Sequence, residues 1–84
     1  MQNNNLLALY SMPGCIHCSR IEELCKSLGI PYQYKDCMDP KTRREFIRLF
    51  PGEDKVPQIM WEGKHITFSQ FKEMIDVKLK NGEI

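Results

Sequence analysis

The sequence of 84 residues has no long hydrophobic run and no excess of charge of one sign. Its longest unbroken apolar stretch, residues 6–10, is far shorter than the ~20 residues that a membrane-spanning helix needs. Twelve Lys and Arg residues against eleven Asp and Glu residues leave a net charge of +1, which supplies no long-range field for a polyanion. We therefore expect no membrane span and no nucleic-acid partner.

The chain also has no internal repeat, linker or low-complexity stretch, and its length suits one compact core. Residues 1–5 contain no basic residue, and no long apolar stretch with a small-residue cleavage site follows them, so we expect no secretion signal. The sequence thus predicts a single domain over residues 1–84, a monomer in the reducing cytoplasm.

Two of the four cysteines, Cys15 and Cys18, form a Cys-x-x-Cys pair. In an intracellular chain this spacing indicates redox or metal chemistry more than a disulfide scaffold. The metal alternative makes the pair half of a zinc site completed by His17, Cys25 or Cys37, although no second Cys-x-x-Cys or His-x-His follows. Cys25 is interpreted as a small core residue, and Cys37 as either an inert thiol or a regulatory or oligomerising surface thiol.

Hydrophobic periodicity predicts an α/β chain in the order strand, helix, strand, helix, strand, strand, helix. The predicted strands are residues 6–12, 32–36, 57–61 and 65–67. The first helix runs from residue 16 to a stop at Gly29, and the second from Asp39-Pro40 to the breakers at 51–52. Ser69 is the expected start of the third helix, which ends near residues 81–82.

A right-handed crossover makes the first two strands parallel, and the closing hairpin completes a four-stranded mixed sheet with helices on both faces. This βαβαββα order is a thioredoxin-like layout. The apolar residues expected on the buried sides of the second and third helices are Phe46, Ile47, Leu49 and Phe50, then Phe71, Met74, Ile75, Val77 and Leu79.

Cys15 falls where the first strand turns into the first helix, at or next to the N-cap. Free backbone amides and the helix dipole there favour its thiolate, which makes Cys15 the predicted nucleophile. Cys18 lies one turn later on the buried stripe and is the predicted resolving thiol. Protonated His17 would stabilise the reduced form and make the protein more oxidising, unless its side chain only points into water.

The segment YSMPGCIHC, residues 10–18, resembles the active-site segment of glutaredoxins, and KVPQI, residues 55–59, resembles their Thr-Val-Pro loop, in which the proline is cis. The order of elements matches too, so the resemblance covers nearly the whole chain. It implies a glutaredoxin fold and a thiol–disulfide oxidoreductase that reduces protein disulfides and glutathione mixed disulfides. Glutathione is the implied reductant, no cofactor or metal is bound, and the likeness to small phage-type members implies electron supply to ribonucleotide reductase.

The resemblance also implies a glutathione site. The cysteinyl backbone of glutathione would pair with Val56 next to Pro57, unless Pro57 is an ordinary trans proline at an edge strand. Arg44 would contact the glycine carboxylate, or it is a solvated helix cation. The γ-glutamyl end would meet the start of the last helix, at Phe68 and Ser69.

Three departures from the glutaredoxin pattern all touch glutathione recognition. Met12 replaces a lysine, whose charge Lys55 would supply; the Gly-Gly before the last helix is absent; and Ser69 replaces an aspartate. None of them touches the dithiol. Two alternatives stay open: a glutaredoxin-shaped thioredoxin reduced by a flavoprotein thioredoxin reductase, and a binding module that holds zinc or an iron–sulfur cluster on Cys15.

Overall fold

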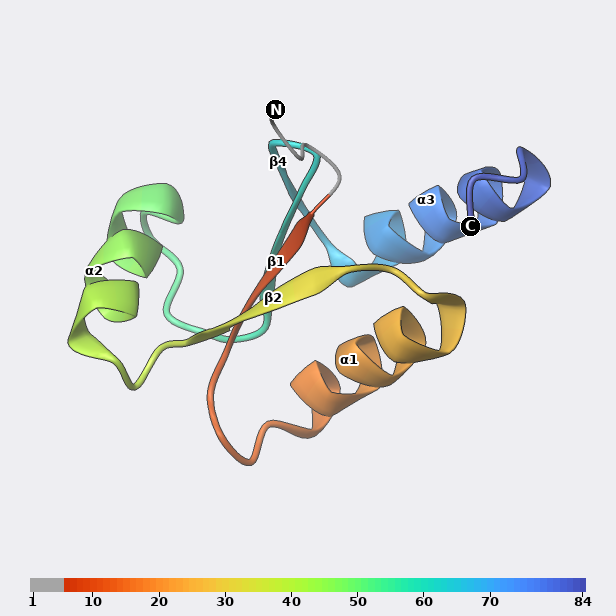
Figure 1. Ribbon diagram of the computed structural model, residues 1–84. Coiled ribbons are helices and arrows are strands. Elements are labelled where there is room, and N and C mark those ends of the chain that lie inside the picture. The colour runs from red at the N-terminus through yellow and green to blue at the C-terminus, as the bar shows by residue number, and fades with distance from the viewer. Residues whose placement is uncertain (1–5) are drawn as a thin grey trace.

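The computed structural model describes residues 6–84 and contains the predicted elements in the predicted order (Figure 1). The strands are β1 (Leu7–Ser11), β2 (Tyr32–Asp36), β3 (Gln58–Trp61) and β4 (Lys64–Ile66), and the helices are α1 (Ile16–Leu28), α2 (Pro40–Leu49) and α3 (Phe68–Lys80). No helix within residues 6–84 is long and apolar enough to cross a membrane. Residues 1–5, on which the expectation about secretion rests, lie outside the described residues.

The four strands form one mixed sheet in the order β2-β1-β3-β4. β1 runs parallel to β2, with Ser11 opposite Asp36, and antiparallel to β3, with Tyr10 opposite Gln58. β3 and β4 form the closing antiparallel hairpin. Helix α2 covers one face of the sheet, and α1 and α3 cover the other (Figure 1), which confirms the predicted fold class.

The two faces of the sheet bury two separate hydrophobic clusters. The larger one joins the sheet to α1 and α3 and includes Leu9, Ile21, Trp61 and Phe71, with the Trp61 and Phe71 ring centroids 5.5 Å apart. Cys25 is fully buried in this cluster, so its interpretation as a core residue is confirmed. The smaller cluster lies under α2 and consists of Tyr10, Cys37, Phe46 and Phe50.

Several expectations about side-chain placement were wrong. Ile47 is 62% exposed and Val77 55% exposed, although both were expected to face the core. Each residue advances a helix by about 100°, so Ile47 turns away from the sheet when Phe46 and Phe50 face it, and Val77 turns away from the side of Ile75. Leu49 and Leu79 are exposed as well, whereas Cys37, one candidate for a surface thiol, is buried.

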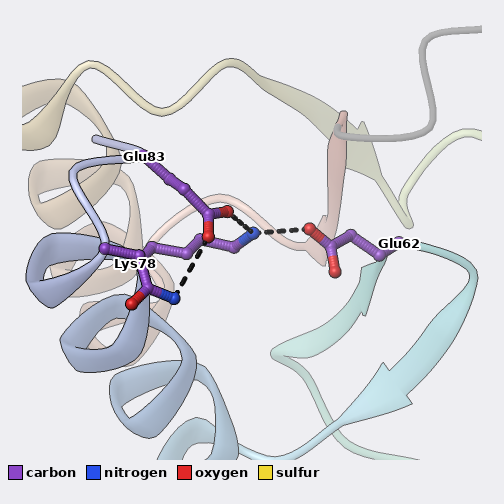
Figure 2. A network of polar contacts seen from close by, with 4 residues as sticks. Glu62, Lys78 and Glu83 are labelled. Atoms are coloured by element: carbon purple, nitrogen blue, oxygen red, sulfur yellow. Dashed lines mark hydrogen bonds and ion pairs between the residues drawn. The ribbon is translucent and has the colours of Figure 1, made fainter.

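Ion pairs among Lys78, Glu62 and Glu83 connect the C-terminal part of α3 to the β3–β4 turn (Figure 2). Lys78 Nζ lies 2.6 Å from Glu62 Oε2 and 3.4 Å from Glu83 Oε1. The same amine lies 5.3 Å from the centroid of the Trp61 ring, a cation–π distance. The hydrogen bond to Glu62 raises the pKa of Lys78, so the amine is held in its charged form. These contacts fix α3 across the sheet.

The start of α3 also differs from the expectation. Thr67, not Ser69, is the N-cap: its hydroxyl oxygen accepts the Gln70 N–H at 3.1 Å, and Gln70 Oε1 accepts the Thr67 N–H at 2.8 Å. This reciprocal pair is a capping box, whose Thr-x-x-Gln spacing was present in the sequence. Since β4 ends at Ile66, the helix follows the strand after a single residue.

The capping box leads to the first prediction. Thr67→Ala removes one side of the box and should lower the free energy of unfolding by about 1 kcal/mol. Ser69→Ala, the matched control in the first turn, should change it by less than about 0.5 kcal/mol. Urea unfolding followed by circular dichroism measures both variants. A larger loss for Ser69→Ala than for Thr67→Ala would contradict the assigned cap.

Candidate functional site

Cys15 lies at the junction of strand and helix, as the sequence predicted. It is the N-cap of α1, with extended backbone angles (φ −83°, ψ 112°), and Gly14 before it takes the left-handed φ of 83° that closes the turn. The Cys15 C=O accepts the Ser19 N–H at 3.1 Å, and Cys15 Sγ accepts the Cys18 N–H at 3.3 Å. The sulfur therefore occupies the place of a capping oxygen, where the free amides and dipole of α1 favour negative charge.

Cys18 occupies a different environment from its partner. Its side chain is only 1% exposed, whereas Cys15 is partly exposed. Burial, together with hydrogen bonding to Cys15, raises the pKa of Cys18 to about 11. The pair thus presents one accessible sulfur at a helix N-terminus and one protonated sulfur behind it. Such a pair can form a mixed disulfide at the outer sulfur and resolve it from the inner one.

The proline loop meets the dithiol at the same edge of the sheet. The Val56–Pro57 peptide bond is cis, which confirms the expectation from the resemblance. Because Gln58 pairs with Tyr10 in antiparallel register, Pro57 lies at the C-terminal end of β1, where the Cys15 loop leaves the strand. Val56 precedes the ladder between β1 and β3, and its side chain packs on the cluster under α2.

A cavity of about 260 Å³ lies beside this loop. It is lined by His17, Arg20 and Ile21 of α1, by Pro57, and by Phe68 at the start of α3. A second cavity of about 310 Å³ shares three of these lining residues and extends to Glu53, Gln58 and His65. The fold therefore brings together three residues that the sequence had singled out: His17, Pro57 and Phe68.

Three other expected residues lie apart from this cavity. Arg44 lines a separate groove of about 410 Å³ along α2, because α2 covers the opposite face of the sheet from α1 and α3. Lys55 is exposed in the loop before β3, and its C=O accepts a hydrogen bond from Gln58 Nε2 at 3.0 Å. Ser69 is exposed in the first turn of α3, next to Phe68.

Two features of the cavity region were not predicted from the sequence. Arg20 follows His17 by three residues, a helical spacing that places both on one side of α1, and this spacing was a usable signal. His65 Nε2 lies 2.6 Å from Gln58 Oε1, and its ring lies 4.5 Å from that of Phe50, centroid to centroid. This second feature joins β3, β4 and the end of α2, and no local pattern signals it.

Within residues 6–84, no three His, Cys, Asp or Glu side chains are grouped as metal ligands. Cys25 is enclosed in the core cluster of α1 and α3, and Cys37 lies on the other face of the sheet under α2. Neither is placed to complete a site with the Cys-x-x-Cys pair, so the zinc alternative finds no support in the described part of the chain.

Comparisons with known proteins agree with this geometry. The family model described as Glutaredoxin matches residues 7–66. The chain is similar to buckwheat glutaredoxin, solved in complex with glutathione, with 28% identity and a TM-score of 0.69 over 94% of this chain and 76% of that one. No curated protein matches the sequence.

Two further solved structures show the same fold at lower identity. A glutaredoxin from Archaeoglobus fulgidus is 22% identical, with a TM-score of 0.66 over 84% of this chain and 86% of that one. A thioredoxin-like protein, solved as a mutant, is 16% identical, with a TM-score of 0.72 over 83% of this chain and 94% of that one.

The unequal environments of the two sulfurs predict selective alkylation. A pKa of about 11 in place of 9.0 leaves Cys18 with roughly a hundredfold less thiolate at neutral pH than an ordinary thiol has. Iodoacetamide at neutral pH should therefore label Cys18→Ser once, at Cys15, and leave Cys15→Ser unlabelled. Labelling of Cys18 in Cys15→Ser should require a pH well above neutral, because burial, the largest cause of the raised pKa of Cys18, remains in that variant. Mass spectrometry counts the adducts, and rapid labelling of Cys18 at neutral pH would contradict the assignment.

Proposed function

The chain belongs to the glutaredoxin family and is a thiol–disulfide oxidoreductase, and on this premise we propose that it reduces protein disulfides and glutathione mixed disulfides with electrons from glutathione. The observation that carries the proposal is the arrangement of the dithiol. An accessible Cys15 sulfur accepts a backbone N–H at the N-cap of α1, and a buried Cys18 thiol lies behind it. We further propose the cytoplasm, with its glutathione pool, as the compartment of the reaction.

The proposed reaction has two exchange steps. The Cys15 thiolate attacks one sulfur of the substrate disulfide, and the other sulfur leaves as a thiolate that takes up a proton. The Cys18 thiol then loses its proton and attacks Cys15 Sγ, which releases the second substrate thiol and leaves a Cys15–Cys18 disulfide. Two electrons have passed to the substrate. Two glutathione molecules restore the dithiol by the reverse sequence and leave as glutathione disulfide.

The proposed glutathione site follows the cavity beside the proline loop. Support comes from the solved buckwheat glutaredoxin, which was crystallised with glutathione, and from the shared cavity wall of Pro57 and Phe68. In this arrangement the cysteinyl backbone pairs with Val56, and the γ-glutamyl carboxylate meets the free amides at the start of α3, at Phe68 and Ser69. Arg44 is the proposed contact for the glycine carboxylate.

Two observations favour a second candidate, a glutaredoxin-shaped thioredoxin reduced by a flavoprotein reductase. Arg44 lines a groove on α2 and not the cavity beside Pro57, so one proposed anchor for glutathione stands apart from the others. Met12, in place of the usual lysine, leaves an apolar side chain 38% exposed near the dithiol. Both features weaken attraction for a carboxylate. Electron supply to ribonucleotide reductase is compatible with either reductant.

A pair of coupled assays tests the proposal. Oxidation of NADPH is followed with a small mixed-disulfide substrate, once through glutathione and glutathione reductase and once through thioredoxin reductase. We expect turnover through glutathione and loss of turnover to background in Cys15→Ser, because no other described thiol is accessible at a helix N-terminus. Turnover through the flavoprotein alone would establish the second candidate. Full activity of Cys15→Ser would reject the dithiol mechanism.

The cavity also predicts a role for Arg20 in glutathione recognition. Arg20 lines the same cavity as Phe68, and its guanidinium keeps its positive charge at any pH at which the protein is folded. Arg20→Gln should raise the KM for a glutathione mixed disulfide about three- to fivefold with little change in kcat, as expected for loss of one exposed contact with a carboxylate. Lys26→Gln, on the same helix, serves as the matched control. Equal effects of both substitutions would exclude a specific contact.

A further inference from the structure

Helix α2 carries a concentration of positive charge, of which the proposed glutathione site uses only Arg44. Lys41, Arg44 and Arg48 recur at helical spacing and line one groove of about 410 Å³ together with Lys35 of β2. We call these four residues the basic stripe. Arg43 adds a further exposed cation to the same helix.

The charges of the basic stripe are largely unneutralised. Glu45 is the carboxylate that lines the groove, and it is already engaged by Lys35 at 3.2 Å and by the Tyr10 hydroxyl at 3.0 Å. Within residues 6–84, no salt bridge involves Lys41, Arg44 or Arg48. Arg48 interacts electrostatically with Glu45 as well, so four cations share this one carboxylate and the groove keeps a net positive charge.

The field of the stripe is local. The whole chain has a net charge of only +1, so the surface outside α2 and Lys35 carries a net negative charge. A long polyanion that reached beyond α2 would meet repulsion. The ten residues of α2 span about 15 Å, which suits a short acidic segment. Ile47, 62% exposed and three residues after Arg44, offers such a segment an apolar contact.

The fold ties the stripe to the dithiol. β1 and β2 are parallel, so the Cys15 loop and the start of α2 leave the same edge of the sheet. A backbone hydrogen bond of 2.8 Å from the Cys37 N–H to the Ser11 C=O joins the two connections directly. Figure 1 shows that the beginning of α2 and the loop that precedes α1 lie at the same end of the sheet.

We propose that the basic stripe docks a short acidic segment of a protein substrate and so delivers the substrate's disulfide to Cys15. The delivery step rests on the proposed function, whereas the docking step does not. Carboxylates pair with the free Lys and Arg side chains, and charge complementarity raises the rate of encounter and selects acidic partners.

Docking is tested with two fluorescent peptides that contain no cysteine. One is rich in Asp, Glu and Leu, and the other has Asn and Gln in place of the acids. Fluorescence anisotropy with the full chain should show binding of the acidic peptide only, and raising the salt from about 50 mM to about 0.3 M should weaken it severalfold. The salt series uses the wild-type chain and does not depend on the folding of any variant.

Matched variants locate the binding. Lys41→Gln/Arg48→Gln should bind the acidic peptide roughly fivefold more weakly. Lys26→Gln/Lys80→Gln removes the same charge from α1 and α3 and should bind as the wild type does. Equal binding of both peptides, or equal losses in both double variants, would overturn the docking surface. Tighter binding of a short single-stranded oligonucleotide than of the acidic peptide would also overturn it.

A second arm measures kcat/KM for versions of the two peptides that are each extended by a disulfide. The Lys41→Gln/Arg48→Gln variant should lose roughly fivefold on the acidic peptide and nothing on a small mixed disulfide. An unchanged kcat/KM on the acidic peptide would overturn delivery to Cys15. Selective binding of the acidic peptide without reduction by the wild-type chain would support the docking surface and contradict the proposed function, so the two failures are distinguishable.

Discussion

The pairing of β1 with its two neighbours is the constraint on which the site depends. Parallel register sets Ser11 opposite Asp36, and antiparallel register sets Tyr10 opposite Gln58. The Cys15 loop, the start of α2 and the cis-proline loop therefore all meet at one edge of the sheet. A slip of one residue in either ladder would send the side chains of a strand to the opposite face and separate these connections.

The chemistry at that edge comes from an unequal environment around two identical side chains. Cys15 caps α1 and receives a backbone N–H, whereas Cys18 is buried and its pKa is raised. Helix α1 supplies both environments. Its N-terminus offers unpaired backbone amides to Cys15, and Cys18, one turn later, lies on the face of the helix that packs against the sheet. Nucleophile and resolving thiol are thus distinguished by position alone.

The two proposed recognition sites lie on opposite faces of the sheet. On the face of α1 and α3, the cavity beside Pro57 and Phe68 is small and partly apolar, as suits the tripeptide glutathione. On the face of α2, the basic stripe is open and charged, as suits a protein segment. Both faces border the edge from which Cys15 projects, and Arg44 is the one residue that the two proposed sites share.

The sequence by itself determined the elements, their order and the position of the dithiol, because periodicity, breakers and the Cys-x-x-Cys spacing are local signals. The sequence did not predict that Arg20 and Phe68 line one cavity, or that Arg44 lies in a different groove from Pro57. Both facts depend on which face of the sheet each helix covers. Only the packed structure decided them. The Thr67 cap of α3 was encoded locally, by the Thr-x-x-Gln spacing of a capping box, whereas the exposure of Ile47 was decided by the rotation of α2 about its axis, which tertiary contacts set.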